Sequence, residues 1–201
     1  MHILAITPLG KRKCKVLTDE GFAFPFYRGE IRDRKLEEGA ELTEAAWEAI
    51  RTEILLPRAR ERCFYLLKDR DRTTAEIRRK LREGSYPESV IEETIDRLKE
   101  YHYLDDRRYA EHYLEICRER RSLLQIRQTL QQRGISREIL EDLTAREDRE
   151  QEAGQIRSFL LRHRYTRDTD EKEQRKIVAA LMRRGYSYEQ IRSAMREAET
   201  D

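Results

Sequence analysis

The stretch YLDDRRYA at residues 103–110 decides the fold, because it has the pattern of a joint between two helices. Asp105 is a favoured N-cap residue, since its carboxylate accepts hydrogen bonds from the free backbone N–H groups of the next turn. Leu104 and Tyr109 stand where two apolar side chains close over a helix start as a hydrophobic staple. We therefore predict a structural joint at Leu104, Asp105 and Tyr109, and capping explains the aspartate without any catalytic role.

The segments around this joint repeat one another. Three glycines recur at intervals of 50 and 51 residues, and each is followed by a glutamate four positions later and an aliphatic residue six positions later. The matched positions are Gly84, Glu88 and Val90, then Gly134, Glu138 and Leu140, then Gly185, Glu189 and Ile191. An internal repeat of this length predicts tandem helical units that stack in series.

Each unit reads as three short helices. In the first unit, Pro57 suits the first turn of a helix, and Thr73 with Glu76 forms a capping box. Gly84 is predicted to end the second helix in the left-handed conformation, and a third helix follows over 87–101. The second unit repeats this pattern, with a capping box at 122–125.

The third unit departs from the pattern, because Glu173 stands where the other units have a capping hydroxyl. Its second helix is therefore expected to begin earlier, near Thr169 or Asp170.

Residues 1–40 have a different character, with three short runs of β-forming residues. They predict a small antiparallel sheet of two or three strands, in which Pro25 restricts the third run to an edge. A helix with Thr43 as its N-cap should follow and pack Trp47 beneath the sheet. The fold class is thus mainly α, with expected segments 1–55 (sheet and helix), 56–104, 105–147 and 148–201 (three-helix repeats).

The residues that carry chemistry in enzymes are scattered in this chain. The three cysteines and four histidines lack metal-ligand spacing, and no glycine-rich phosphate loop is present. We expect no enzymatic activity and no cofactor. No run of residues is long and apolar enough to span a membrane, and the first residues lack the basic start of a signal peptide. We expect a cytoplasmic monomer.

Charge is segregated along the chain, although the net charge is only +2. Residues 118–137 carry six arginines and one glutamate, whereas residues 138–152 carry seven acids and two arginines. A solvated helix face is the simpler interpretation of any single arginine, but arginines repeated along a solenoid favour one extended binding surface. The candidates for partner or DNA contact are Arg78, Arg79, Arg82, Arg120, Arg121, Arg127, Arg133, Arg183 and Arg184.

Several of these segments together resemble the RecX family of RecA regulators. The resemblance rests on RTTAEIRRKL at 72–81, Gly84, VIEETIDRL at 90–98, YLDDRRYA at 103–110 and RRSLLQIRQTLQQRGIS at 120–136. It covers roughly 57–147 well and 148–201 more loosely. It implies three tandem three-helix units and no catalytic residues. It also implies a negative regulator of recombination, DNA repair and the SOS response that binds the RecA–single-stranded DNA filament and limits its growth, ATPase and co-protease activity.

Two other functions compete with this one. Helix, glycine turn and helix over 74–98 resemble a helix-turn-helix, which would bind single- or double-stranded DNA directly. Against this, the expected recognition helix carries Glu88, Glu92, Glu93 and Asp96, which repel phosphates. A scaffold for another partner would explain the repeats but not YLDDRRYA.

Overall fold

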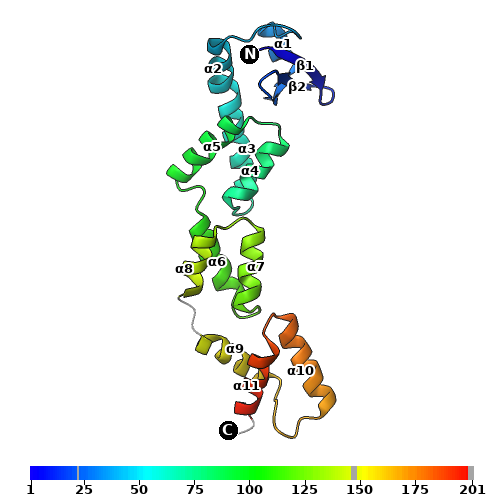
Figure 1. Ribbon diagram of the computed structural model, residues 1–201, viewed down its shortest axis with the longest axis vertical. Helices are drawn as coiled ribbons and strands as arrows, with labels where there is room; N and C mark the ends of the chain where they lie inside the picture. Colours follow the sequence, from blue (N-terminus) through cyan, green and yellow to red (C-terminus); the bar gives the residue numbers. More distant parts are fainter. Residues whose placement is uncertain (22, 146–148, 199–201) are drawn as a thin grey trace. The chain divides into compact units, whose positions relative to one another are not determined.

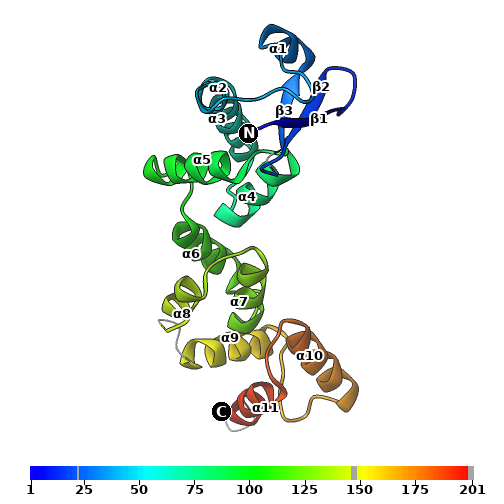
Figure 2. The same ribbon diagram turned by 45° about the horizontal axis from the view of Figure 1, so that its top comes forward.

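The computed structural model describes residues 1–21, 23–145 and 149–198, and its elements are labelled in Figures 1 and 2. The protein is mainly helical with one small sheet, as the sequence predicts. It divides into two compact units, Met1–Asp105 and Asp106–Asp201, called unit 1 and unit 2 below.

The sheet of unit 1 has three antiparallel strands in the order β1-β2-β3, visible in Figure 2. The strands are β1 (Ile3–Pro8), β2 (Lys13–Thr18) and β3 (Ala23–Tyr27). Val16 pairs with Ile6 on one side and Phe24 on the other, and both Val16 and Phe24 are fully buried. Pro25 lies in the edge strand β3, as expected for a residue without a backbone N–H.

A helix covers the buried face of this sheet. Helix α2 (Glu44–Ile50) begins after Thr43, whose hydroxyl accepts a hydrogen bond from the Ala46 N–H at 3.2 Å. Trp47 is buried, with its ring centroid 5.1 Å from that of Phe24, so its predicted place in the core is confirmed. A short helix α1 (Arg28–Asp33), which the sequence did not predict, follows β3 directly.

The helical run does not end before Pro57. Helix α2 continues through a π-helical turn (Arg51–Leu55) into α3 (Leu56–Leu67), so Pro57 lies in the first turn of a helix, as predicted, but that helix is not separated from the one before it. The wide turn lies where the proline ring would otherwise clash with the carbonyl of Glu53, four residues earlier. The expected segment boundary at 55/56 thus falls inside a continuous helical run.

The first repeat shares its core with the sheet. It consists of α3, α4 (Thr74–Glu83) and α5 (Glu88–Glu100). Its buried side chains join the strand residues in one cluster, and they include Ala59, Cys63, Leu66, Ile77, Leu81, Val90, Ile91, Ile95, Leu98 and Leu104. Small antiparallel sheets are marginal alone, and this shared core stabilises the sheet of unit 1.

Unit 2 contains the other two repeats. The second repeat is α6 (Asp106–Cys117), α7 (Leu123–Gln132) and α8 (Arg137–Ala145). The third is α9 (Arg149–Arg162), α10 (Glu171–Arg183) and α11 (Tyr188–Ala198). Each has its own buried cluster, centred on Ile126 and Leu130 in the second repeat and on Ile156 and Leu181 in the third.

The turn after the second helix of each repeat agrees with the prediction in the second and third repeats and differs from it in the first. Gly134 and Gly185 adopt positive φ angles of 84° and 91°, as predicted, but Gly84 has a φ of −80°. Ser85 takes the left-handed conformation instead, with a φ of 61°. Ser85, Gly134 and Gly185 are therefore the equivalent positions. The predicted register of the first repeat was off by one residue, because the glycine that aligns by sequence is the helix C-cap itself.

The starts of the second helices follow the predicted capping chemistry in two repeats out of three. Thr73 and Glu76 form the complete capping box. Asp170 caps α10 and accepts from the Glu173 N–H at 2.9 Å, which confirms the earlier start of that helix. At Ser122 only half of the predicted box is present, since the side chain of Gln125 is used elsewhere.

Candidate functional site

The joint residues lie in two different cores. Leu104 is buried in the core of unit 1, and α6 begins at Asp106, directly after Asp105. Tyr109 packs in unit 2 against the cluster that contains Ala110. Leu104 and Tyr109 belong to different units, and the staple between them stays a prediction.

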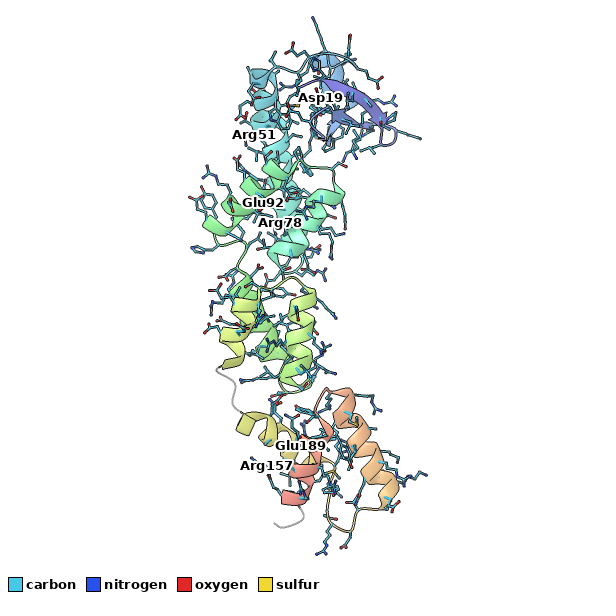
Figure 3. All side chains as sticks on the ribbon, viewed as in Figure 1. Asp19, Arg51, Arg78, Glu92, Arg157 and Glu189 are labelled. Carbon is cyan, nitrogen blue, oxygen red and sulfur yellow. The ribbon has the colours of Figure 1, made fainter. Side chains whose placement is uncertain are left out.

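Two candidate arginines of α4 are engaged within unit 1. Arg78 makes a two-pronged ion pair with Glu92 of α5, at 2.6 and 2.7 Å (Figure 3). This bonding holds the pKa of the Glu92 carboxyl below its ordinary value of 4.5. Arg82 forms a similar pair with Glu88, at 3.0 and 2.5 Å. The acids of α5 are therefore matched by the arginines of α4, and both arginines serve the packing of the repeat.

Two more candidates lie over aromatic rings. The guanidinium of Arg133 is 4.7 Å from the ring centroid of Tyr113 and donates a hydrogen bond to the Tyr109 hydroxyl. The guanidinium of Arg184 is 4.4 Å from the ring centroid of Phe159. Cation–π contacts of this kind hold a guanidinium in place. Both residues are half-buried, and we assign them a packing role.

The remaining candidates present their charge outward. Arg120 and Arg183 are exposed and Arg127 is half-buried, and none of the three has an ion pair within the part of the chain that the structure describes. Arg121 is exposed and donates to the Tyr113 hydroxyl at 2.9 Å. Among the described residues, the ion pair of Arg79 is a long 3.9 Å contact to Glu83. Arg120, Arg121, Arg127 and Arg183 are thus the candidates most open to a partner.

Hydrogen bonds bring the start of α7 against the end of α10. The Ser122 N–H donates to the Arg184 carbonyl and the Gln125 side-chain amide donates to the Arg183 carbonyl, both at 2.7 Å. The carbonyl oxygens at a helix C-terminus lack intrahelical partners, and these donors supply them.

Glu152 of α9 extends this junction. Its carboxylate accepts from the Leu123 N–H at 3.0 Å and from the Gln190 side-chain amide at 2.8 Å. An acid at a helix N-terminus also interacts favourably with the helix dipole. One carboxylate therefore joins α7, α9 and α11.

A groove of about 560 Å³ lies at this junction, and we call it the α7–α10 groove. Its lining includes Leu123, Leu124, Arg127, Met182 and Tyr186. Leu124 and Met182 are 58% and 52% exposed, which is high for large apolar side chains. Apolar anchors beside open arginines are typical of a surface that binds a protein partner.

The groove was only partly predictable. Arg127 of the groove was a candidate, but Leu124 and Met182 were not. The junction bond from Gln125 was missed as well, because residues 122–125 were interpreted as a local capping box. Gln125 and Arg183 are 58 positions apart, so no local pattern links them.

Among the described residues, no group of three or more His, Cys, Asp or Glu side chains could hold a metal ion. Across the same ranges, no helix is both long and apolar enough to cross a bilayer.

Tandem three-helix units that present a partly apolar groove with Arg127 in its lining define a helical-repeat interaction protein. Three family models match the chain, namely the first, second and third three-helix domains of RecX, at residues 59–98, 105–143 and 161–195. The chain belongs to the RecX family of regulatory proteins.

Individual relatives agree with this assignment. Regulatory protein RecX of Clostridium botulinum (strain Eklund 17B / Type B) is 26% identical over 199 residues, which cover 97% of this chain and 94% of the relative. Regulatory protein RecX of Mycobacterium ulcerans (strain Agy99) is 33% identical over 135 residues, 64% of this chain and 78% of the relative.

Solved structures are similar as well. A crystal structure of regulatory protein RecX matches 96% of this chain and 98% of its own, with 27% identity and a TM-score of 0.58. A crystal structure of RecX from Lactobacillus salivarius matches 72% of this chain and 96% of its own, with a TM-score of 0.60. At 23% identity, the second comparison supports the fold alone.

Proposed function

We propose that this chain is a negative regulator of the RecA recombinase. It binds the RecA filament on single-stranded DNA, contacts more than one RecA subunit, and limits filament growth, ATP turnover and co-protease activity. Family membership supports the regulatory role, and three repeats in series offer more than one surface to a filament that is itself repetitive. This role requires no catalytic residue of the chain. The proposal also has the chain acting as a monomer in the cytoplasm.

The observation that carries this proposal is the α7–α10 groove. Arg127 lines the groove, and Arg183 lies at the adjacent end of α10. Neither arginine has an ion pair among the described residues, so an acidic partner can pair with them without breaking an existing ion pair. Leu124 and Met182 offer apolar surface in the groove beside Arg127. An apolar side chain of RecA flanked by carboxylates fits this combination, because buried apolar anchors supply affinity and complementary charge supplies orientation.

The candidates Arg78, Arg82, Arg133 and Arg184 have a lesser part in this proposal. A partner would have to displace Glu92, Glu88 or a tyrosine or phenylalanine ring to reach them. Contact with RecA is therefore assigned first to Arg120, Arg121, Arg127 and Arg183.

Co-sedimentation with preformed RecA filaments on single-stranded DNA tests the proposal. The double variant Arg127→Glu and Arg183→Glu should bind at least about 10-fold more weakly, since truncating or reversing central charges of an interface typically costs this much. The matched control is Arg137→Glu with Arg175→Glu, two exposed arginines that already pair with Glu141 and Glu171 on their own helices. Equal binding by the groove variant and the wild-type chain would contradict the assignment of the groove.

A further inference from the structure

A cationic cleft lies in unit 1, between the β1–β2 hairpin and the first repeat. It has a volume of about 540 Å³, and its charged lining is Lys13 from β2, Arg58 and Arg62 from α3, and Lys80 and Glu83 from α4. None of these residues was a candidate from the sequence, because they are scattered over 70 positions and come together only in the fold. The hairpin tip adds the exposed residues Lys11 and Arg12.

The cations of this cleft differ in what already neutralises them. Arg58 pairs with Glu30 and donates to the Pro25 carbonyl at 3.1 Å, and Lys80 pairs with Glu83 at 2.6 Å. Lys13 and Arg62 have no carboxylate within ion-pair distance among the described residues. The cleft therefore keeps a positive charge that an anion can neutralise.

Aromatic rings accompany the two open cations. The Lys13 ammonium lies 5.4 Å from the ring centroid of Tyr27, and the Arg62 guanidinium lies 5.6 Å from that of Tyr65. Tyr27 is 40% exposed and Tyr65 is 65% exposed. A ring holds a cation in position without cancelling its charge, and an exposed ring is also a surface on which a nucleobase can stack.

We propose that this cleft binds single-stranded nucleic acid. Phosphate groups lie against Lys13 and Arg62, and bases stack on the exposed ring of Tyr65. Open cations of the cleft beside exposed rings suit a strand that carries both charge and flat bases, whereas an acidic polypeptide would make no use of the rings. A duplex keeps its bases stacked on one another, and so it also would not engage them. The site is independent of RecA, and so is its test.

The test measures fluorescence anisotropy of a labelled twenty-residue oligodeoxythymidylate with the full-length chain alone. The variant Lys13→Ala with Arg62→Ala should bind at least about 5-fold more weakly. The slope of log K against log salt should fall by about 1.4, since each lost phosphate contact on a single strand removes about 0.7. The variant Tyr65→Leu should lose at least about 5-fold in affinity without any change of slope, because stacking releases no counterions.

The matched control is Arg32→Ala with Arg97→Ala, which removes two exposed arginines of unit 1 that do not line the cleft. It should bind within about two-fold of the wild-type chain. Circular dichroism melting checks that each variant is folded. If the double variant does not fold, Lys13→Gln alone should still reduce the slope by about 0.7.

Three results would overturn the proposal. One is binding by the cleft variant within two-fold of wild type, and another is an equal loss in the control. The third is equal displacement of the oligonucleotide by poly-glutamate of the same charge, which would assign the cleft to acidic polypeptides instead.

Discussion

The backbone N–H of Ser122 donates to the carbonyl oxygen of Arg184 across 2.7 Å, and so the start of one repeat is bonded to the end of a helix in the next. The Ser122 hydroxyl meanwhile caps its own helix by accepting from the Gln125 N–H at 3.3 Å. One residue thus serves both the local helix and the junction of the second and third repeats. This junction fixes the α7–α10 groove, on which the proposed binding of RecA depends.

Replacing Gly185 by alanine should damage this junction. Gly185 has a φ of 91°, and an added Cβ would lie 2.4 Å from Gln125 Cγ and 2.5 Å from Ser122 Oγ. The left-handed conformation and the clash together should lower the free energy of unfolding by about 2–4 kcal/mol. Urea denaturation followed by circular dichroism measures the change.

Gly154 supplies the control for this substitution. It lies inside α9, and no atom other than those of its chain neighbours and of its own helix backbone is within 4 Å of an added Cβ. Gly154→Ala should therefore raise the free energy of unfolding by about 0.5–1 kcal/mol, as alanine does in a helix interior. Equal effects of the two substitutions would show that the junction is not packed as described.

The pair of Arg78 and Glu92 should contribute a small, pH-dependent stabilisation. Because Arg78 lowers the pKa of Glu92 below 4.5, the contribution is present above that pH and is lost as the pH falls through the lowered pKa of the folded state. The Glu92 side chain is 42% exposed, so solvent screening should limit the coupling to about 0.5–1 kcal/mol. A double-mutant cycle with alanine, at pH 7 and at pH 3, measures it.

The pair of Arg137 and Glu141 is the comparison for this cycle. It spans one turn of α8, and its arginine side chain is 86% exposed. Its coupling should be smaller than that of Arg78 and Glu92, because solvent screens a fully exposed pair. A larger coupling at Arg137–Glu141 than at Arg78–Glu92 would be inconsistent with a packing role for Arg78.

Cys63 should make stability fall in alkaline solution. Burial raises the pKa of its thiol from 9.0 to about 12. Between these values the unfolded chain loses the thiol proton and the folded chain keeps it, so the free energy of unfolding falls by up to about 1.4 kcal/mol per pH unit from this group.

The variant Cys63→Ala lacks this thiol and hence its part of the pH dependence. Its deficit in stability relative to the wild-type chain should shrink as the pH rises from about 9 to about 11. Urea denaturation of both proteins over this range provides the comparison. A deficit that stays constant would mean that Cys63 ionises equally in the folded and unfolded chains.

Local chemistry explains which parts of the fold were predictable. Thr73 and Asp170 cap helices by bonds to N–H groups three residues away, so the sequence around them is sufficient. The turn at Ser85 was missed because a serine, not the glycine, takes the left-handed conformation there. The π-helical turn before Pro57 was missed because a wider turn accommodates the proline without ending the helical run. The helix starts that the sequence predicts correctly are thus those that depend on residues close by in the chain.

The surfaces were less predictable than the helices, because they join residues that are distant in sequence. Clustered arginines were visible in 118–137, but only the fold separates Arg133, held over Tyr113, from Arg127, which lines a groove. The cationic cleft of unit 1 depends on Lys13 meeting Arg62, 49 positions later. No short motif contains both.

ATP turnover by RecA on single-stranded DNA, measured while this chain is titrated in, tests the central claim most directly. We expect turnover and filament length to fall as the chain is added, and the variant Arg127→Glu with Arg183→Glu to require at least about 10-fold more protein for the same effect. The Arg137→Glu with Arg175→Glu control should inhibit like the wild-type chain. Unchanged turnover and unchanged filament length in the presence of excess wild-type protein would contradict the proposed regulation of RecA.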